Sequence, residues 1–136
     1  MDVDEWADRY ARAWEDADDE AAGALFTDDA TYRSDPFREA YRGREAIRGY
    51  WREVTARQKD VQVVIGRTMV DGDRALVEWW TQMDSDGTPV TLPGALLLDL
   101  AEDGRCRALR EYWTVEAGRC VPPPDDWGAD PLYICT

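Results

Sequence analysis

Two glutamates occur in segments whose alternation of apolar and polar residues is typical of β-strands. Glu78 falls on the same strand face as Trp80 and Gln82, and Glu111 falls on the same face as Trp113, because side chains two residues apart share one side of a strand. If both faces line one cavity, its wall carries two carboxyl groups next to indole rings. The two carboxyl groups could then transfer protons to and from a bound molecule.

A carboxylate pair in an apolar cavity has a defined chemical use. Loss of solvation and mutual repulsion raise the pKa of one member, so one group can hold a proton while the other accepts one. The alternative is the opposite strand parity, in which the faces that carry the glutamates point outward. In that case the acids point to solvent or to a subunit interface, and Val77 and Trp79 point inward.

The chain contains no histidine. This removes the commonest general base near neutral pH, the commonest metal ligand and every nucleophile system that depends on an imidazole. The single lysine, Lys59, lies in a polar connection and is a poor candidate for a Schiff base. We therefore expect no metal and no cofactor, and proton carriers drawn from carboxylates, tyrosines and cysteines.

The charge of the chain is strongly unbalanced. There are 16 basic and 29 acidic residues, which gives a net charge of −13. A surface of this sign repels phosphate backbones and anionic membranes, so we expect neither nucleic acid nor a membrane as a partner. No apolar run reaches membrane-spanning length, and the N-terminus lacks the basic-then-apolar pattern of a secretion signal.

Three cysteines occur, an odd number without the spacing of a zinc site: Cys106, Cys120 and Cys135. The first falls in an expected strand and the other two in the C-terminal tail. Since no motif marks the chain for export, we expect a cytoplasmic protein whose thiols are reduced.

The N-terminal part of the sequence predicts three helices and one short strand. Asp2 can cap a first helix, with Glu5 three residues later, and aromatic residues at 6, 10 and 14 give this helix an apolar face. A short second helix starts at 18 or 19, and the segment 30–34 is a short strand stopped by Pro36. Gly43 precedes a third helix with apolar residues at helical spacing.

The second half of the sequence predicts a sheet. Four extended segments follow one another, separated by turn sequences: 61–70, 74–83, 90–100 and 105–115. Pro93 and Gly94 indicate a bulge or bend within the third segment. Helices first and a curled sheet afterwards describe a cone with one open mouth and a pocket inside.

The composition changes after Gly118. Four of the seven prolines lie in this tail, at 122, 123, 124 and 131. We therefore divide the chain into one domain, 1–117, and a Pro-rich C-terminal arm, 118–136. The arm is expected to lie on the surface and not to form a separate domain.

Several short motifs resemble one family in their order and spacing: Asp8-Arg9-Tyr10, Leu25 to Thr31, Asp35-Pro36 and Gly43 to Arg48. Over roughly residues 5–117 the chain resembles the SnoaL-like branch of the nuclear transport factor 2-like superfamily, which includes ketosteroid isomerase, polyketide cyclases and limonene epoxide hydrolase. The resemblance implies an α+β fold, a cystatin-like cone (an α+β barrel) in which three N-terminal helices pack on a strongly bent antiparallel sheet. It implies no single reaction, because this fold carries enzymes and binding proteins alike.

The resemblance also implies site residues. Tyr10 matches an oxyanion-stabilising tyrosine and Asp35 a catalytic base, although one extra residue puts Ser34 at that position by strict counting. The family register turns Glu78 and Glu111 into the pocket. Leu96 replaces a second, protonated aspartate of ketosteroid isomerase. The expected ligand contacts are Trp14, Tyr32, Trp51, Trp80, Gln82, Leu96 and Trp113.

The expected function is acid–base catalysis without a cofactor. The substrate would be a hydrophobic, oxygenated small molecule and the reaction an isomerisation, cyclisation or hydration, with Glu78 and Glu111 transferring the proton. The alternative is a non-catalytic ligand-binding or dimeric scaffold protein of the same fold. A homodimer is expected through the outer sheet face, where Val77, Trp79 and Tyr112 would form an apolar patch.

Overall fold

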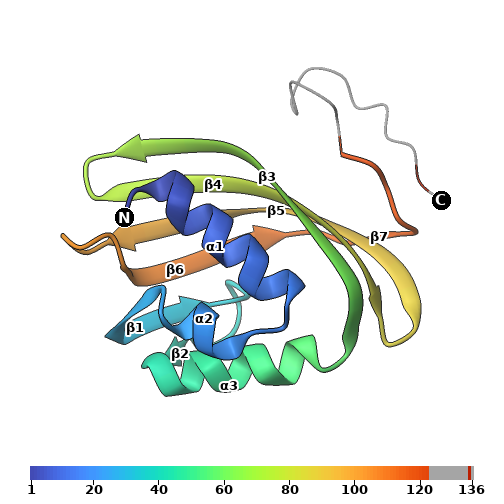
Figure 1. Cartoon of the computed structure of the whole chain (residues 1–136), viewed down its shortest axis with the longest axis horizontal. Coiled ribbons are helices and arrows are strands. Elements are labelled where there is room, and N and C mark those ends of the chain that lie inside the picture. The colour runs from blue at the N-terminus through green and yellow to red at the C-terminus, as the bar shows by residue number, and fades with distance from the viewer. Residues whose placement is uncertain (123–134, 136) are drawn as a thin grey trace.

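The computed structural model describes residues 1–122 and 135, and this part of the chain forms three helices and seven strands (Figure 1). The helices are α1 (Val3–Glu15), α2 (Asp19–Gly23) and α3 (Arg44–Thr55). The strands are β1 (Phe26–Arg33), β2 (Tyr41–Arg42), β3 (Gln58–Asp71), β4 (Arg74–Ser85), β5 (Thr88–Leu100), β6 (Cys106–Trp113) and β7 (Glu116–Ala117).

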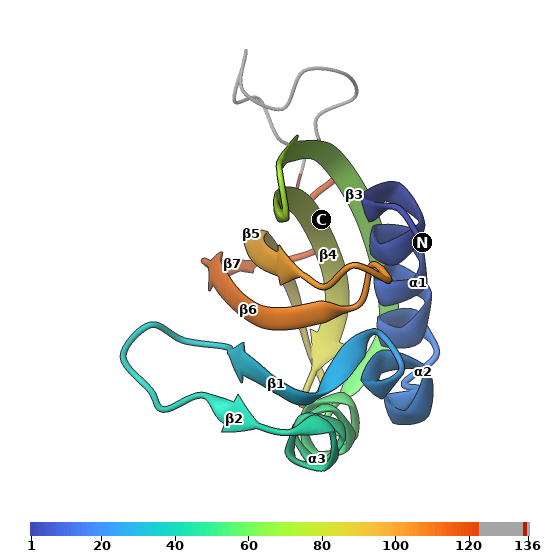
Figure 2. The same ribbon diagram turned by 90° about the vertical axis from the view of Figure 1, so that its left-hand side faces the viewer.

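The strands form one sheet in the order β2-β1-β6-β5-β4-β3, and β7 pairs with β5. Every pair is antiparallel except β1 and β6, which run parallel. The parallel pair arises because the chain passes through α3 and three long strands before it returns beside β1. The long strands curl beside the helices (Figure 2). The expected α+β cone is confirmed, with one parallel pair in a sheet that is otherwise antiparallel.

The pairing of β3 with β4 is irregular. Its register shifts twice, between Lys59 and Gln62 and between Ile65 and Thr68. A shift of this kind places an extra residue in one strand, which increases the local twist and bends the strand. The irregular pairing therefore contributes to the curl that makes a cone out of a flat sheet.

Helix α1 places its aromatic face against the sheet. The Asp2 carboxylate accepts a hydrogen bond from the Glu5 backbone N–H at 2.8 Å, which satisfies one of the free donors of the first turn. Trp6, Tyr10 and Trp14 are buried, and the helix lies along β3 (Figure 1). Burial of these rings stabilises the fold and also fixes Tyr10 and Trp14 at the interior.

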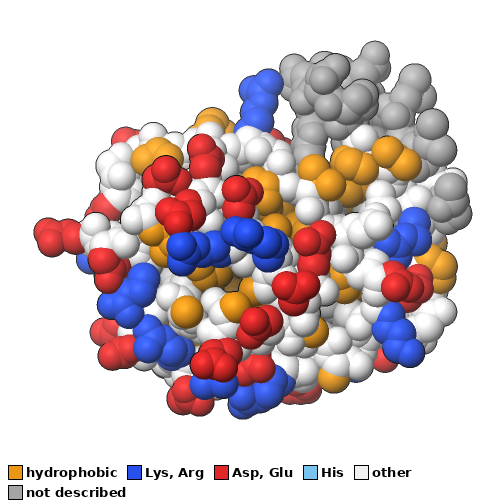
Figure 3. Space-filling view, in the orientation of Figure 1, with side chains coloured by type: hydrophobic (Ala, Val, Ile, Leu, Met, Phe, Trp, Pro, Cys, Tyr) orange, Lys and Arg blue, Asp and Glu red, His pale blue; other side chains and the backbone are white. Residues whose placement is uncertain are grey.

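Helix α3 lies beside α2, and arginines join the two. Ile47 and Trp51 are buried, whereas the guanidinium groups of Arg48 and Arg52 both lie 3.0 Å from the Asp19 carboxylate. On the face shown in Figure 3, basic and acidic side chains are interspersed in the same way. None of the helices in the described residues has the length and apolar character that crossing a bilayer requires.

The parity of β4 is opposite to the one expected from the family register. Val77 and Trp79 belong to the buried core, so Glu78 and Trp80 lie on the outer face. With this parity Glu78 keeps contact with water, and the tryptophan on its face, Trp80, is covered by the chain at Cys120. The predicted outer patch is therefore wrong in composition, because only Tyr112 of its three members is exposed.

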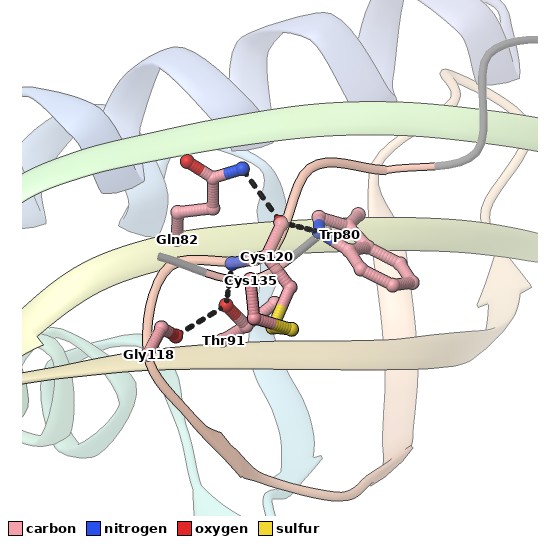
Figure 4. The surroundings of a disulfide bond; sticks show 6 residues. All are labelled: Trp80, Gln82, Thr91, Gly118, Cys120 and Cys135. Atoms are coloured by element: carbon pink, nitrogen blue, oxygen red, sulfur yellow. Dashed lines mark hydrogen bonds between the residues drawn. A yellow bond between two sulfur atoms is a disulfide. The ribbon is translucent and has the colours of Figure 1, made fainter. Parts of the chain in front are cut away.

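The start of the C-terminal arm covers part of this outer face (Figure 4). The Cys120 carbonyl accepts hydrogen bonds from Trp80 Nε1 at 2.8 Å and from Gln82 Nε2 at 2.7 Å. The Thr91 hydroxyl accepts from the Cys120 backbone N–H at 2.7 Å and donates to the Gly118 carbonyl at 2.8 Å. Trp80 and Gln82 thus hold the arm and do not face the inside of the cone.

A disulfide bond joins Cys120 to Cys135 (Figure 4). Cys106 is a free, buried thiol. The expectation that all three thiols are reduced is therefore wrong. Cysteine spacing alone specifies no pairing, because the pairing depends on how closely the folded chain brings the two Cα atoms together. Of the expected arm, residues 123–134 and 136 lie outside the described residues, and the division of the chain at 117 stays a prediction.

Gly94 allows a close approach of β5 to its neighbours. It pairs with Trp79 in unbroken register, so the β4–β5 ladder shows no bulge here. A Cβ atom at this position would lie 2.5 Å from Trp79 Cζ2 and 2.8 Å from the Tyr112 carbonyl oxygen. We predict that Gly94→Ala lowers the free energy of unfolding by about 1–3 kcal/mol, the usual cost of overpacking, in chemical denaturation.

The matched control is Gly49→Ala in α3. A Cβ atom there would meet only the tip of the Arg52 side chain, at 3.9 Å. Because alanine is the better helix former, this change should raise the free energy of unfolding by about 0.5–1 kcal/mol. Equal effects of the two changes would contradict the close packing at Gly94.

The disulfide joins cysteines 15 residues apart. A cross-link over a loop of this length restricts the unfolded chain and contributes about 3 kcal/mol in the chain-entropy description. We predict that a reductant lowers the free energy of unfolding by up to that amount. The Cys135→Ser variant should show the lower stability with and without reductant. If a reductant still lowers the free energy of unfolding of this variant, the effect does not come from the Cys120–Cys135 disulfide.

Candidate functional site

The concave side of the sheet encloses a cavity of about 450 Å³, a size typical of small-molecule sites. Its wall is formed by Trp14, Tyr50, Val54, Arg57, Gln58, Trp79, Met83, Ser85, Val90, Leu92, Glu111, Trp113 and Val115. A recess of about 40 Å³ is lined by Tyr10, Trp14, Tyr32, Tyr50, Trp51, Val54, Thr55 and Glu111. The two spaces share four residues and form one site, whose wall combines aromatic and aliphatic side chains with a few polar groups.

Glu111 lines both the cavity and the recess. It lies on the inner face of β6 and is only 5% exposed. The Tyr32 hydroxyl donates a hydrogen bond to its Oε1 at 3.0 Å. Burial raises the pKa of Glu111 to about 8, and the hydrogen bond from Tyr32 lowers it only in part. The carboxyl group is therefore mostly protonated at neutral pH.

Three tyrosine hydroxyls lie close to this carboxyl group. Burial is the main cause that raises the pKa of Tyr10, Tyr32 and Tyr50, and the charge of Glu111 raises it further. A side-chain hydrogen bond with Tyr32 opposes part of the shift at Tyr10, and one with Ser34 does so at Tyr50. These hydroxyls stay neutral at physiological pH, so they act as hydrogen-bond donors and not as bases.

Aromatic contacts hold the hydroxyls in place. The ring of Tyr10 meets Trp14 and Trp51 edge-on at centroid distances of 5.9 and 5.4 Å, and Trp14 meets Trp79 at 5.1 Å. Trp14 Nε1 also donates to Gln58 Oε1 at 2.8 Å. Edge-on pairs of this kind are favourable beyond the burial of their area. The connected rings couple α1, α3 and β4 and give the site a rigid wall.

Of the residues predicted to be catalytic, the structure brings Tyr10 and Glu111 to one site. Glu78 lies on the outer face of β4, so the predicted carboxylate pair does not form. Burial, and not repulsion by a second acid, therefore causes the raised pKa of Glu111. In the described part of the chain, no three cysteine or carboxylate side chains converge as a metal site would require.

Asp35 caps its own loop instead of facing the cavity. Its Oδ1 accepts a hydrogen bond from the Phe37 backbone N–H at 2.8 Å, an Asx turn. Ser34 lies behind the wall: its side chain contacts the Tyr50 hydroxyl and its carbonyl accepts from Trp113 Nε1 at 2.9 Å, but it borders neither the cavity nor the recess. The turn accommodates the extra residue of this loop, and neither Ser34 nor Asp35 lines the cavity or the recess.

Of the seven predicted ligand contacts, four line the cavity or the recess: Trp14, Tyr32, Trp51 and Trp113. Trp80 and Gln82 are on the other side of the sheet, as a consequence of the β4 parity. Leu96 pairs with Glu111 and is fully buried in the core, but it borders neither space.

Sequence reasoning missed most of the wall, and three of the missed residues show which signals the sequence did and did not contain. Tyr50 lies on the apolar face of α3 beside the predicted Trp51, so helical spacing contained a signal for it. Trp79 was expected on the outer face of β4, so its place on the cavity wall was missed. Arg57 follows the end of α3, and no pattern in the sequence marks it as a cavity residue.

Helices that close a curled sheet around an aromatic cavity define a small-molecule pocket protein of the α+β cone class. The sequence matches the family model of the SnoaL-like domain over residues 7–109. The chain therefore belongs to the SnoaL-like family, and the predicted superfamily is confirmed. None of the curated proteins matches the chain at a significant level.

Several solved structures share the fold. A hypothetical protein of Catenulispora acidiphila with a ketosteroid isomerase-like fold, in complex with trimethylamine, is 26% identical, with a TM-score of 0.75 over 84% of this chain and 88% of that one. SalBIII, an epoxide hydrolase/cyclase-like enzyme in pyran ring formation in the polyether salinomycin, is 21% identical, with a TM-score of 0.74 over 84% and 94%. An LEH-like epoxide hydrolase of Mycobacterium tuberculosis is 22% identical, with a TM-score of 0.68 over 81% and 80%.

The raised pKa of Glu111 makes stability depend on pH. This carboxyl group titrates near 4.5 when exposed and near 8 in the folded protein, so between these values the folded state binds more protons. The contribution of Glu111 to the free energy of unfolding should therefore fall by up to about 1.4 kcal/mol per pH unit as the pH rises through this window. Above it the loss is complete and the contribution levels off.

Chemical denaturation across this pH range tests the effect. Glu111→Gln should flatten the pH dependence and make the protein more stable than the native chain at the alkaline end, because a neutral amide needs no desolvated charge. Glu78→Gln, which changes a carboxylate on the outer face of the same sheet, should keep the native slope. If Glu111→Gln also keeps it, the carboxyl group is not desolvated as described.

Proposed function

We propose that this SnoaL-like protein is a cofactor-independent enzyme that transfers a proton at a hydrophobic, oxygenated small molecule, with Glu111 as the proton carrier. The observation that carries the proposal is a buried carboxyl group with a pKa of about 8 on the wall of a cavity of about 450 Å³. A group with this pKa can both give and take a proton near neutral pH. Burying it without an ion pair lowers stability, which argues against a purely structural role.

Each residue of the site has a role in this proposal. Protonated Glu111 donates its proton to an oxygen of the substrate, and the Tyr32 hydroxyl stabilises the carboxylate that remains. Tyr50, which also lines the cavity, offers a neutral donor to a carbonyl, ether or epoxide oxygen. The substrate returns a proton to Glu111 later in the reaction. The rings of Trp14 and Trp79 hold its apolar part.

The number of carboxyl groups on the wall limits which reactions the site can catalyse. With Glu78 outside, the described wall contains one, Glu111. One group that takes a proton from one atom and returns it to another serves an isomerisation, or a ring closure in which the substrate supplies its own hydroxyl. Hydration needs a further group to activate water. The tyrosines do not supply it, because their raised pKa values keep the hydroxyls protonated. Isomerisation or cyclisation is therefore favoured.

A non-catalytic small-molecule-binding protein is the second candidate. It is favoured by the burial of Tyr10 and Tyr32, which line only the small recess, so their hydroxyls do not border the main cavity. Both candidates bind a ligand next to Trp14 and Trp79, so tryptophan fluorescence should respond in either case. Turnover separates them.

Assembly and compartment belong to the proposal as well. A homodimer through the outer sheet face now rests on exposed Tyr112, at 46%, and on the habit of the superfamily, because Val77 and Trp79 are inside. Sedimentation at high micromolar concentration measures it. A cytoplasmic location rests on the sequence alone, and the disulfide between Cys120 and Cys135 is more typical of an oxidising compartment.

Turnover of a substrate panel tests the proposed function. The panel contains β,γ-unsaturated ketones for isomerisation and hydroxy-epoxides for cyclisation. On a substrate that the native protein converts, Glu111→Gln should lower turnover by about a hundredfold or more, whereas Glu78→Gln should leave it unchanged. Full activity of Glu111→Gln would refute the role of this residue. Fluorescence-detected binding without any turnover by the native protein would favour the binding protein.

The pH profile of that turnover gives an independent check. If Glu111 acts as an acid, turnover should fall above about pH 8, as the carboxyl group loses its proton. Tyr32→Phe removes the hydrogen bond that lowers this pKa, so the falling limb should move to higher pH. If the falling limb of the Tyr32→Phe variant stays at the native pH, the group that titrates is not Glu111.

A further inference from the structure

Four arginines gather on and beside the outer face of β1, β2 and β6: Arg33, Arg38, Arg42 and Arg110. We call them the arginine cluster. Elsewhere arginines pair with acids, as Arg48 does with Asp19 and Arg74 with Asp99. No member of the cluster forms an ion pair within residues 1–122 and 135. In a chain with 29 acidic and 16 basic residues, pairing would be the default.

Strand pairing brings these side chains together. Arg33 and Arg110 are direct partners in the parallel pair, and Arg42 is the partner of Thr31 on the other side of β1. Because Tyr32 and Glu111 point into the cone, their neighbours Arg33 and Arg110 point to the outer face. Like charges on directly opposed residues destabilise a sheet. An anion between the guanidinium groups would relieve this repulsion.

The cluster borders two hollows of about 170 and 320 Å³. Arg33 and Arg42 border both, Arg110 the first and Arg38 the second. No residue of the cavity or the recess borders either hollow, so this is a separate place on the molecule. Glu39 is the one carboxylate on the border of the second hollow.

The loop between β1 and β2 is held in shape by its own hydrogen bonds. Arg33 donates to the Arg38 carbonyl, and the Asx turn at Asp35 fixes the Phe37 backbone. Phe37 borders the second hollow and is 90% exposed, which is unusual for a large apolar residue. A flat apolar ring therefore lies beside several guanidinium groups that form no ion pair within the described residues.

We propose that the arginine cluster binds a small ligand with a multivalent phosphate group, such as a nucleoside diphosphate, and that Phe37 contacts the flat part of the ligand. Guanidinium groups match phosphate oxygens with paired hydrogen bonds, and several of them together suit more than one phosphate charge. The net charge of −13 repels long polyanions such as nucleic acids, whereas a small ligand meets mainly the local charge.

Calorimetry on the full chain tests the proposal with four probes: inorganic phosphate, inorganic pyrophosphate, ADP and a hexaglutamate peptide. Pyrophosphate should bind more tightly than phosphate, because it reaches more of the guanidinium groups. ADP should bind more tightly than pyrophosphate if Phe37 contacts the base, and Phe37→Ser should remove that difference. Equal binding of ADP and pyrophosphate would overturn the role of Phe37 and would identify the ligand by its phosphate group alone.

Variants separate this site from general attraction. Arg33→Gln and Arg110→Gln should each weaken pyrophosphate binding by about tenfold or more, as loss of charge-assisted hydrogen bonds does. Arg74→Gln, which changes a paired arginine on β4, is the matched control and should leave binding unchanged. Without ligand, Arg110→Gln should melt at or above the native temperature, because a repulsion is removed, whereas Arg33→Gln also loses the hydrogen bond to the Arg38 carbonyl. The rise in melting temperature caused by pyrophosphate should be lost in both variants.

Three outcomes would overturn the proposal. The first is that none of the phosphate probes binds at millimolar concentration. The second is binding that is equal in the native protein, the Arg33→Gln variant and the Arg110→Gln variant. The third is binding of hexaglutamate without binding of pyrophosphate, which would make the cluster a contact for an acidic protein segment.

Discussion

The parallel pairing of β1 with β6 is the constraint on which the site depends. It brings Tyr32 beside Leu109 in the ladder and places the Tyr32 hydroxyl on the carboxyl group of Glu111, 79 residues further along the chain. Helices α1 and α3 then enclose the pair, and their rings exclude the water that would otherwise keep Glu111 ionised. Without this pairing, the Glu111 carboxyl group would lose its hydrogen bond from Tyr32 and would be exposed to water. The fold therefore buries the Glu111 carboxyl group and raises its pKa by the same contacts.

The polar groups of the interior are mostly donors. The hydroxyls of the buried tyrosines stay protonated, and Glu111 itself carries a proton at neutral pH. Among the described residues, Trp51 Nε1 and Trp79 Nε1 are buried without an acceptor. A buried donor without a partner lowers stability, and an oxygen of a ligand would satisfy it. An interior of this kind suits molecules with carbonyl, ether or epoxide oxygens better than amines.

Element order and amphipathic spacing were enough to predict the cone, its three helices and the buried face of α1, because these depend on period and on turn residues. The inward side of β4 was not predictable in the same way. Both faces of this strand carry a tryptophan, and the choice between them depends on what covers the outer face, which is the arm at Cys120. Asp35 was misplaced because a turn absorbed the extra residue, a local event without a pattern. The disulfide, too, depends on a folded path that composition does not contain.

The register shifts of β3 have a consequence beyond the shape of the cone. β3 is the last strand on one side of the sheet, and an edge strand with free backbone groups can recruit the edge of another molecule. Its two shifts interrupt the regular row of donors and acceptors, and Glu15 occupies the Val63 N–H at 2.9 Å. At the opposite edge, β2 is only two residues long. Both margins of the sheet thus offer few regularly spaced free backbone groups to another sheet, and so disfavour the edge-to-edge stacking that leads to fibres.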